Sequence, residues 1–459
     1  MRIVRLVLVH FAFVAASAAR AATPAPPPFD APALNRIFDV LESNQRLRGS
    51  VAISRDGRLV YSRAFGLRDA QAKVTTATMF RVGSITKVFT AALIYQLIDE
   101  KKLTLATPLA RFFPQIPNAE SITIAHLLAH ASGIPNFPSG ADVANPKSWI
   151  FERQTKEQMV ARFAARKPDF APGEKVSYSN ANYVLLGYIV ETITHSGYDA
   201  QLQKRIARKL GLRRTRFGGS VRTANDEAHS FVWDDGHWNQ QPEEDLSVSA
   251  GAGAIVSTPS DLAKFITALF AGRLVSARSM QELITPLTPQ LDGVERKGVV
   301  VATLHRGLEK TIYSHLGGID GFRSNLVYFP DDRVAIAITL NGQDYPMGKL
   351  FWLLADSVYG RPVTAPSFAT IALPAETLAQ YVGVYSFPQI GMDIAITRDG
   401  NQLRAQATNQ DSFRIEAVSD VLFSDPSSGI LIEFRREADG SVPSFTLYQG
   451  TSELTFRRK

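Results

Sequence analysis

Hydrophobic positions along the chain follow a helical period in some stretches and a strand-like pattern in others. In residues 31–44 the apolar side chains recur every three or four positions, which predicts a helix. Residues 50–55 and 59–65 are strand-like and flank Asp56-Gly57, a dipeptide that favours a tight hairpin. After Gly83 the pattern turns helical, and helices are expected to dominate to about residue 210, with loops at 114–119, 133–145 and 168–175.

Beyond residue 210 the chain returns from helical to strand-like patterns. Residues 247–256 are rich in glycine and alanine and lead into 257–262, where Thr258-Pro259 is typical of a helix start. Strand patterns occupy 298–340, and 351–358 fit a last helix. Because strands lie at both ends of this region, we expect the ends to share one antiparallel sheet beside a helical insertion, an α+β (α/β sandwich) fold.

A proline-containing linker at 361–374 precedes the C-terminal 85 residues, 375–459. Short strand-like runs alternate there with turn signals such as Asp399-Gly400 and Asp439-Gly440, which predicts a small all-β barrel or sandwich. The runs are 381–387, 392–397, 402–407, 413–417, 430–435 and 444–447.

The N-terminus has the features of a signal peptide over residues 1–21. A basic start is followed by the apolar run 6–16 and by Ala19-Arg20-Ala21, a small-x-small cleavage site. The run is too short for a comfortable permanent membrane span, although an uncleaved anchor is the alternative. We therefore expect cleavage after Ala21, export to the periplasm or the medium, and a main domain at 30–360.

Composition removes several classes of function. The chain has no cysteine, so it forms no disulfide and no thiolate metal site. The formal charge of +7 falls to +4 without the three arginines of the signal peptide, and basic residues are not interleaved with aromatic ones. The sequence therefore has no segment typical of nucleic-acid binding, and we expect the charged residues to lie on a solvated surface.

The segment Ser84-Ile85-Thr86-Lys87 is the strongest candidate for chemistry. At a three-residue spacing on a helix, the serine and the lysine leave the same face one turn apart. A lysine desolvated enough to be partly neutral can take the proton of a serine, which makes the serine a nucleophile toward an acyl group. The structural alternative is that Ser84 caps the helix and Lys87 faces the solvent.

Three further segments follow the pair in the sequence. They are Tyr178-Ser179-Asn180, His315-Leu316-Gly317-Gly318, and the stretch from His126 to Pro135 that contains His130. Together with the serine and lysine they resemble the serine β-lactamase-related, penicillin-recognising hydrolases, closest to the branch of class C β-lactamases, D-aminopeptidases and lactamase-like esterases. The resemblance spans about residues 31–360, and the C-terminal residues resemble the lipocalin-like β domain of some members.

The resemblance implies a role for each matching residue. Ser84 is expected to be acylated, Lys87 to activate it, and Tyr178 to pass a proton between the serine and the leaving group. Asn180 is expected to hydrogen-bond the substrate amide, although it could simply cap the following helix. The backbone N–H groups of Ser84 and Gly318 are expected to form the oxyanion hole, and glycine at Gly317 and at Gly318 leaves room for a substrate beside the strand.

The sequence departs from the lactamases of this branch at His315, where they carry lysine. A histidine is mostly neutral at pH 7 and is a weaker anchor for a β-lactam carboxylate. We therefore expect feeble β-lactam turnover at best. His195 and His305 also begin His-x-Gly segments, but they are interpreted as a helix end and a strand end.

Two other groups of residues leave their interpretation open. His126 and His130 are one helical turn apart, but without a third ligand they are better read as packing and hydrogen-bonding groups than as a metal pair. Trp233 and Trp238 either border the pocket or pair across a plain hairpin.

The sequence predicts an exported serine hydrolase that cleaves ester or amide bonds, including those of D-residue peptides, without metal or organic cofactor. The expected partner is a small-molecule or short-peptide substrate, with no permanent membrane anchor; the sequence leaves the oligomeric state open. The alternatives are a penicillin-binding D,D-peptidase or weak β-lactamase, and a catalytically silent sensor or scaffold of the same fold.

Overall fold

The structure is a computed structural model that describes residues 29–145, 147–234, 237–288, 296–305, 307–408, 410–425, 430–449 and 452–459. The predicted signal peptide at 1–21 lies outside these residues. Within the described ranges, no helix has the length and apolar character needed to cross a membrane. The helix predicted at 31–44 is confirmed as α1 (Ala31–Ser43), and the predicted hairpin as β1 (Leu47–Arg55) and β2 (Arg58–Phe65).

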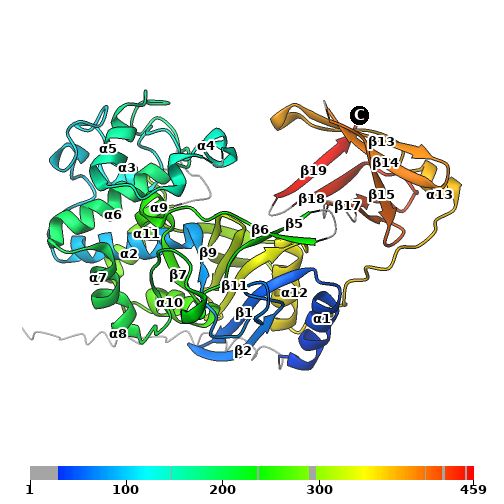
Figure 1. Ribbon diagram of the computed structural model, residues 1–459, viewed down its shortest axis with the longest axis horizontal. Coiled ribbons are helices and arrows are strands. Elements are labelled where there is room, and N and C mark those ends of the chain that lie inside the picture. Colours follow the sequence, from blue (N-terminus) through cyan, green and yellow to red (C-terminus); the bar gives the residue numbers. More distant parts are fainter. Residues whose placement is uncertain are drawn as a thin grey trace, which may run out of the picture.

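A central antiparallel sheet joins the two ends of the main domain, as the sequence predicts (Figure 1). Its strands run in the order β2-β1-β11-β10-β9-β8, so the N-terminal hairpin pairs with strands some 280 residues later, for example Val51 with Ile338. The later strands are β8 (Val300–Leu304), β9 (Lys310–Ile319), β10 (Phe322–Phe329) and β11 (Val334–Gln343), and the hairpin β5 (Phe231–Asp234) and β6 (His237–Gln240) extends the sheet from β11.

Helices cover both faces of this sheet. Successive side chains of a strand point to opposite faces, so Val327 and Phe329 pack with α1 and α12 (Met347–Val358), whereas Leu326 and Tyr328 face the helical region. In Figure 1, α1 and α12 lie together at one side of the sheet, and the other helices of the main domain lie at the other.

The helix at the centre of the molecule is α2 (Thr86–Asp99). Every residue from Thr86 to Leu97 is buried, so α2 is a core helix rather than an amphipathic surface helix. It follows the 3-10 turn η1 (Gly83–Ile85), packs against α6 (Asn180–Thr194) and α9 (Leu246–Gly253), and shares its core cluster with residues of the sheet.

The helical insertion also contains elements that the sequence pattern does not predict. Residues 140–144 form α4 inside a predicted loop, because Ser139 and Asp142 make a reciprocal capping box. The glycine- and alanine-rich stretch forms α9, because Asp245 caps it and its small residues let it contact α6 closely. The helices are α3 (Ile124–Leu128), α4 (Gly140–Ala144), α5 (Lys156–Ala164), α6 (Asn180–Thr194), α7 (Tyr198–Leu202), α8 (Arg208–Leu210), α9 (Leu246–Gly253), α10 (Pro259–Phe270) and α11 (Ala277–Ile284).

Shorter elements complete the main domain. A small sheet joins β3 (Phe80–Arg81), β7 (Ile255–Ser257) and β4 (Arg216–Phe217) and holds the segment just before η1. The remaining turns are η2 (Leu109–Arg111), η3 (Trp149–Phe151), η4 (Gln203–Ala207) and η5 (Thr223–Asn225).

The C-terminal residues form a closed barrel, as expected for a lipocalin-like domain (Figure 1). The sequence pattern misses β16 (Leu422–Asp425), which has only four residues, and β19 (Ser452–Arg458), which carries charged side chains. Lys349 on α12 contacts Glu433 on β17 at 2.9 Å, which ties the barrel to the main domain. After α13 (Ala375–Ala379) come β12 (Gly383–Phe387), η7 (Pro388–Ile390), β13 (Met392–Asp399), β14 (Gln402–Ala407), β15 (Phe413–Ala417), β16 (Leu422–Asp425), β17 (Ile430–Arg435), β18 (Ser444–Gln449) and β19 (Ser452–Arg458).

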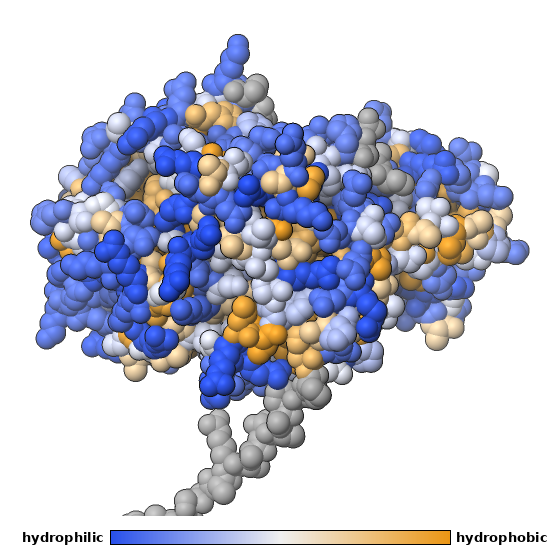
Figure 2. Space-filling view, turned by 60° about the horizontal axis from the view of Figure 1, so that its bottom comes forward, coloured by the Kyte–Doolittle hydropathy of each residue, from blue (hydrophilic) through white to orange (hydrophobic). Residues whose placement is uncertain are grey.

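The face of the molecule in Figure 2 is mostly hydrophilic, with small, scattered apolar areas. Such scattered apolar residues are normal on a globular protein and do not by themselves mark an interface.

Candidate active site

Ser84 lies in the η1 turn directly before α2, and Lys87 is the second residue of that helix. The Nζ atom of Lys87 is 2.9 Å from the Oγ atom of Ser84. The spacing in the sequence therefore places the two groups in contact. Lys87 is 0% exposed, so its amine is held inside the protein, whereas Ser84 reaches the wall of a cavity.

Three oxygen atoms surround the Nζ atom of Lys87. Besides Ser84, they are Oδ1 of Asn180 at 2.8 Å and the carbonyl oxygen of Ala252 at 2.9 Å. An ammonium has three N–H donors, so this set satisfies all of them. If Nζ is a neutral amine, two donors remain for Asn180 and Ala252, and the lone pair faces Ser84.

Tyr178 contacts Ser84 from the other side. Its hydroxyl donates to the Oγ atom of Ser84 at 2.7 Å, and its ring lies 4.8 Å from Nζ of Lys87. The ring stacks on the buried ring of His130, with the centroids 4.5 Å apart. Nδ1 of His130 also accepts from the backbone N–H of Ser179 at 3.1 Å, so His130 fixes the segment that carries the tyrosine.

Asn180 begins α6 and joins the serine–lysine pair through its side chain. Oδ1 accepts from Lys87, and Nδ2 donates to the carbonyl oxygen of Phe137 at 2.8 Å. Both ends of the amide are therefore engaged within the protein, and its direct effect is to orient Lys87. A substrate would have to share or displace the contact with Phe137.

The η1 turn contacts β9 through backbone alone. Gly83 has a φ of +51°, and a Cβ atom there would lie 2.7 Å from the nitrogen of Gly318. A Cβ atom on Gly317 would lie 2.1 Å from the carbonyl oxygen of Val82. Only glycine fits these positions, and the close approach puts the backbone of Gly318 beside Ser84, where the family resemblance expects the two oxyanion donors.

A cavity of about 700 Å³ opens in front of these groups. Ser84 lines it from the η1 turn, Tyr178 and Asn180 from the start of α6 and the residues just before it, and His315, Gly317 and Gly318 from β9. His315 is buried, and its Nδ1 donates to the carbonyl oxygen of Leu316 at 2.5 Å. All seven site residues predicted from the sequence thus meet at one place, with Lys87 directly behind the wall.

Helix α9 is bent at Ala250, which has φ 34° and ψ −125°. This positive φ is costly for a residue with a side chain, on the order of 1–3 kcal/mol. The bend turns the carbonyl of Gly251 toward Thr90 at 2.6 Å and that of Ala252 toward Lys87. Backbone strain therefore accompanies the carbonyl contact that holds the lysine.

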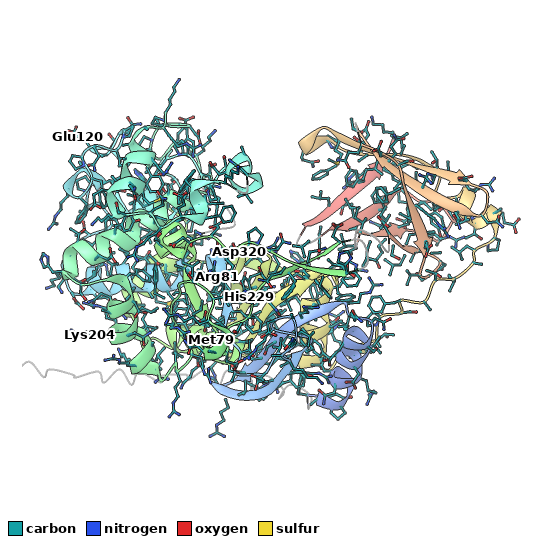
Figure 3. The ribbon with its side chains drawn as sticks, in the orientation of Figure 1. Met79, Arg81, Glu120, Lys204, His229 and Asp320 are labelled. Carbon is teal, nitrogen blue, oxygen red and sulfur yellow. The ribbon has the colours of Figure 1, made fainter. Side chains whose placement is uncertain are left out.

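The end of the cavity near the β9–β10 turn carries charged groups. Glu244, Asp320 and Arg323 line it there. The guanidinium of Arg81 contacts Asp320 at 2.9 Å, and the two labelled side chains lie next to each other in Figure 3. Burial and the neighbouring Asp320 raise the pKa of Glu244 to about 7, an effect that Arg81 opposes.

The other candidates from the sequence lie outside the chemistry. His126 caps α3, accepting from the backbone N–H of Thr123 at 3.3 Å, and burial lowers its pKa. Among the described residues, no group of three or more His, Cys, Asp or Glu side chains could hold a metal ion. Trp233 and Trp238 pair across the β5–β6 hairpin and do not line the cavity, so the hairpin interpretation is correct.

The two remaining His-x-Gly segments are also structural. His195 itself ends α6 in the left-handed conformation, two residues before the glycine that the sequence suggested as the stop. His305 follows the end of β8, as expected for a strand end.

Sequence reasoning missed several groups of the site. The carbonyl of Ala252 carries no side-chain signal, so no sequence pattern indicates its contact with Lys87. His130 is a packing and hydrogen-bonding group, as expected, but the sequence does not indicate that its ring packs against Tyr178. Glu244 and Ser249 lie in a stretch with no recognised motif, although a glutamate just before a glycine-rich segment could have been noted.

Comparisons with known proteins identify the family of this chain. Residues 34–358 match the family model Beta-lactamase, and residues 369–459 match DUF3471, a domain of unknown function. A penicillin-binding protein of Bacillus subtilis (strain 168) is 24% identical over 443 residues, which are 92% of this chain and 97% of that protein. A teichoic acid D-alanine hydrolase of Staphylococcus aureus (strain MRSA252) is 26% identical over 65% of this chain and 71% of its own length.

Solved structures show the same architecture. A D-stereospecific amidohydrolase from Streptomyces sp. superposes with a TM-score of 0.58 and 27% identity, over 67% of this chain and 94% of that one. The expected β-lactamase/transpeptidase-like fold with a C-terminal barrel is thus confirmed. The matched model covers well over half of the chain, and this protein belongs to the Beta-lactamase family of serine penicillin-recognising hydrolases.

Proposed function

We propose that this protein is an exported serine hydrolase that cleaves ester or amide bonds, including those of D-residue peptides, through an acyl-enzyme on Ser84. The observation that carries the proposal is the contact of Ser84 Oγ with both Lys87 Nζ at 2.9 Å and Tyr178 OH at 2.7 Å, on the wall of a cavity. A nucleophile that touches its base and a second proton carrier is the arrangement that acyl transfer needs.

In the first step, the neutral amine of Lys87 takes the proton from Ser84 Oγ while Oγ bonds to the substrate carbonyl carbon. The tetrahedral oxyanion is stabilised by the backbone N–H groups of Ser84 and Gly318, each worth on the order of 3 kcal/mol. The bond to the leaving group then breaks as Tyr178 donates its proton to that group. The proton on Lys87 then passes to the tyrosinate, which restores the Tyr178 hydroxyl and the neutral amine of Lys87.

In the second step, water attacks the acyl carbon and gives a proton to Lys87 or Tyr178. The bond between Ser84 Oγ and the acyl carbon then breaks, and Oγ takes a proton back from these groups. The acid product is released and the free serine is restored, so the cycle balances with the substrate and one water molecule. The engaged Asn180 and the stacked His130 keep Lys87 and Tyr178 in place throughout.

The names of the similar proteins favour a substrate that contains a D-amino acid. One is named a teichoic acid D-alanine hydrolase and another a D-stereospecific amidohydrolase. A second candidate is a penicillin-binding D,D-peptidase or a weak β-lactamase, because one relative is named a penicillin-binding protein. His315 weighs against efficient β-lactam turnover, since histidine is a weak anchor for a carboxylate at pH 7.

The test is to incubate the purified protein with a fluorophosphonate probe, p-nitrophenyl esters, D-alanyl amides, a D-alanyl-D-alanine peptide and a chromogenic cephalosporin. We expect an adduct on the peptide containing Ser84 and turnover of the esters or the amides. Ser84→Ala should abolish both, and Ser441→Ala, at an exposed barrel turn, is the matched control. No adduct and no turnover on any substrate would support the silent scaffold instead.

Export is part of the proposal and rests on the basic start, the apolar run at 6–16 and the Ala19-Arg20-Ala21 site. We expect the mature protein to begin at Ala22 in the periplasm or the medium. N-terminal sequencing after expression in a bacterium checks this. A full-length product that stays with the membrane would favour the uncleaved anchor.

A further inference from the structure

One wall of the active-site cavity carries a carboxylate that the proposed mechanism does not use. Glu244 lines the cavity, and no hydrogen-bond or ion-pair partner of its carboxylate is found among the described residues. The hydroxyl of Ser249 lines the same cavity, is buried, and likewise has no partner in the described part of the chain. A buried hydroxyl usually has a partner, so Ser249 needs an explanation. The carboxylate of Glu244 is half-buried and faces the cavity, where a ligand can reach it.

The backbone of Glu244 is held firmly. Its N–H donates to Asp320 at 2.9 Å, and its carbonyl oxygen accepts from Arg81 at 2.8 Å. Figure 3 shows Arg81 and Asp320 together at the centre of the molecule. Since Asp320 directly follows β9, Glu244 lies at that end of the strand, beyond Gly318 on the side away from His315.

The neighbouring charges do not neutralise Glu244 by direct contact. Arg81 is paired with Asp320 at 2.9 Å, and both side chains are almost fully buried. Arg323 donates to the backbone carbonyls of Asp320 and Phe322 at 3.1 and 2.7 Å. Glu244 is therefore the cavity carboxylate that remains available for a ligand.

We propose that Glu244, with the hydroxyl of Ser249, binds a primary ammonium group on the acyl residue of the substrate. This inference rests on the proposed function, because it assigns the substrate class of that same site. When the oxygen of the scissile carbonyl lies at Gly318, one of the two groups on the carbonyl carbon runs along β9 toward His315. The other group runs toward Glu244. The leaving group needs the proton of Tyr178, so we place the acyl residue, with its free amine, at the Glu244 end.

An ammonium suits these groups better than other ligands. One carboxylate and one hydroxyl provide two of the three acceptors that an ammonium requires, and water can provide the third. A metal ion needs more charged ligands, and Asp320 is already committed to Arg81. A carboxylate on the acyl residue would be repelled by Glu244, although Arg323 in the same wall would attract it.

The test compares D-alanine p-nitroanilide, which has a free amine, with its N-acetyl derivative, which lacks the charge. We expect the wild-type protein to prefer the free amine at least tenfold in kcat/KM. Glu244→Gln should lower kcat/KM for the free amine at least tenfold, mainly through KM, and change the N-acetyl substrate less than twofold. Glu120→Gln, an exposed substitution at the far end of the molecule in Figure 3, is the matched control and should change neither.

The pH profile adds a readout that a structural role would not produce. Binding of the ammonium needs ionised Glu244, so KM for the free amine should rise as the pH falls below about 7, but KM for the N-acetyl substrate should not. The charged groups facing Glu244 are Asp320, Arg81 and Arg323. Equal losses on both substrates in Glu244→Gln, or a wild-type preference for the N-acetyl substrate or for a substrate with an acyl carboxylate, would overturn the proposal.

A binding measurement separates this proposal from the proposed function. Calorimetry on Ser84→Ala with D-alaninamide and N-acetyl-D-alaninamide should show at least tenfold tighter binding of the free amine. If that preference is present but the wild-type protein hydrolyses neither substrate, the ammonium site stands and the hydrolase proposal fails. If hydrolysis occurs without any preference for the amine, the hydrolase proposal stands and the ammonium site is wrong.

Discussion

The two walls of the cavity treat their polar groups in opposite ways. On the wall built by α2 and α6, Lys87 has three oxygen contacts, and Tyr178 is held by Ser84 and by His130. On the wall that carries Glu244 and Ser249, the carboxylate of the first and the hydroxyl of the second have no hydrogen-bond partner among the described residues. The first wall is already organised for catalysis, whereas the second has the properties of a surface that a ligand completes.

The largest expected effect comes from breaking the organised wall at its centre. Lys87→Met keeps the length and the packing of the side chain but removes the base and leaves two acceptors, on Asn180 and Ala252, without their donor. We expect kcat for an ester substrate to fall by about a thousandfold. Steady-state kinetics checks this, with the exposed Lys204→Met as the control; a loss below tenfold would mean that another group activates Ser84.

A smaller loss is expected when only the proton carrier is removed from that wall. Tyr178→Phe keeps the ring stacked on His130 but deletes the hydroxyl that contacts Ser84. We expect kcat to fall about a hundredfold with little change in KM. An amide substrate, whose leaving group needs a proton more than a nitrophenolate does, should be affected more than the nitrophenyl ester; equal effects would argue against a proton-relay role.

The second wall is tested by the dependence of stability on pH. The pKa of Glu244 is about 7 in the folded protein, above its ordinary value of 4.5. The folded state therefore binds this proton more tightly than the unfolded chain, and its stability falls as the pH rises from about 4.5 to 7. We expect Glu244→Gln to be more stable than the wild type at pH 8 by roughly 1–3 kcal/mol and nearly equal to it at pH 4.5.

Urea unfolding of both proteins at the two pH values measures this difference. An equal difference at both pH values would show that the effect of the substitution does not come from ionisation of Glu244.

The smallest effect concerns the residue between the walls. Ala250 follows Ser249 in α9 and lies two residues before Ala252, whose carbonyl contacts Lys87. It has a φ of 34°. Ala250→Gly should relieve this strain and stabilise the protein by about 1 kcal/mol, since the entropy cost of glycine offsets part of the gain. Thermal unfolding checks the prediction; a fall in the melting temperature would mean that the methyl group of Ala250 contributes more than the strain costs.

The sequence predicted the organised wall much better than the other one. The spacing of Ser84 and Lys87 along a helix, and the short segments that contain Tyr178 and His315, are local patterns whose geometry follows from the helix or strand that carries them. The shared sheet followed from strand patterns at both ends of the main domain. Features of this kind can be predicted because each helix or strand is regular, even when the elements that meet are far apart in the sequence.

The other wall could not be predicted, because it depends on contacts without a local pattern. Glu244 becomes a cavity residue only through Asp320 and Arg81, which lie far away in the sequence. The helix α9 was missed because glycine and alanine give no amphipathic period, and its stability comes from close packing on α6. In the barrel, the four-residue β16 is too short to stand out from a turn.

The backbone contact between the η1 turn and β9 sets a limit on how the protein can be re-engineered. A side chain at Gly83 or Gly317 would collide with main-chain atoms of the opposite segment, so saturation libraries at these codons should yield almost entirely inactive clones. Leu316, which precedes Gly317 on β9, lines the cavity and is 56% exposed, so its side chain faces no such barrier. Directed evolution of a new selectivity should therefore begin at that leucine, where side chains of different size and polarity can be sampled, proline excepted because it cannot donate to the strand ladder.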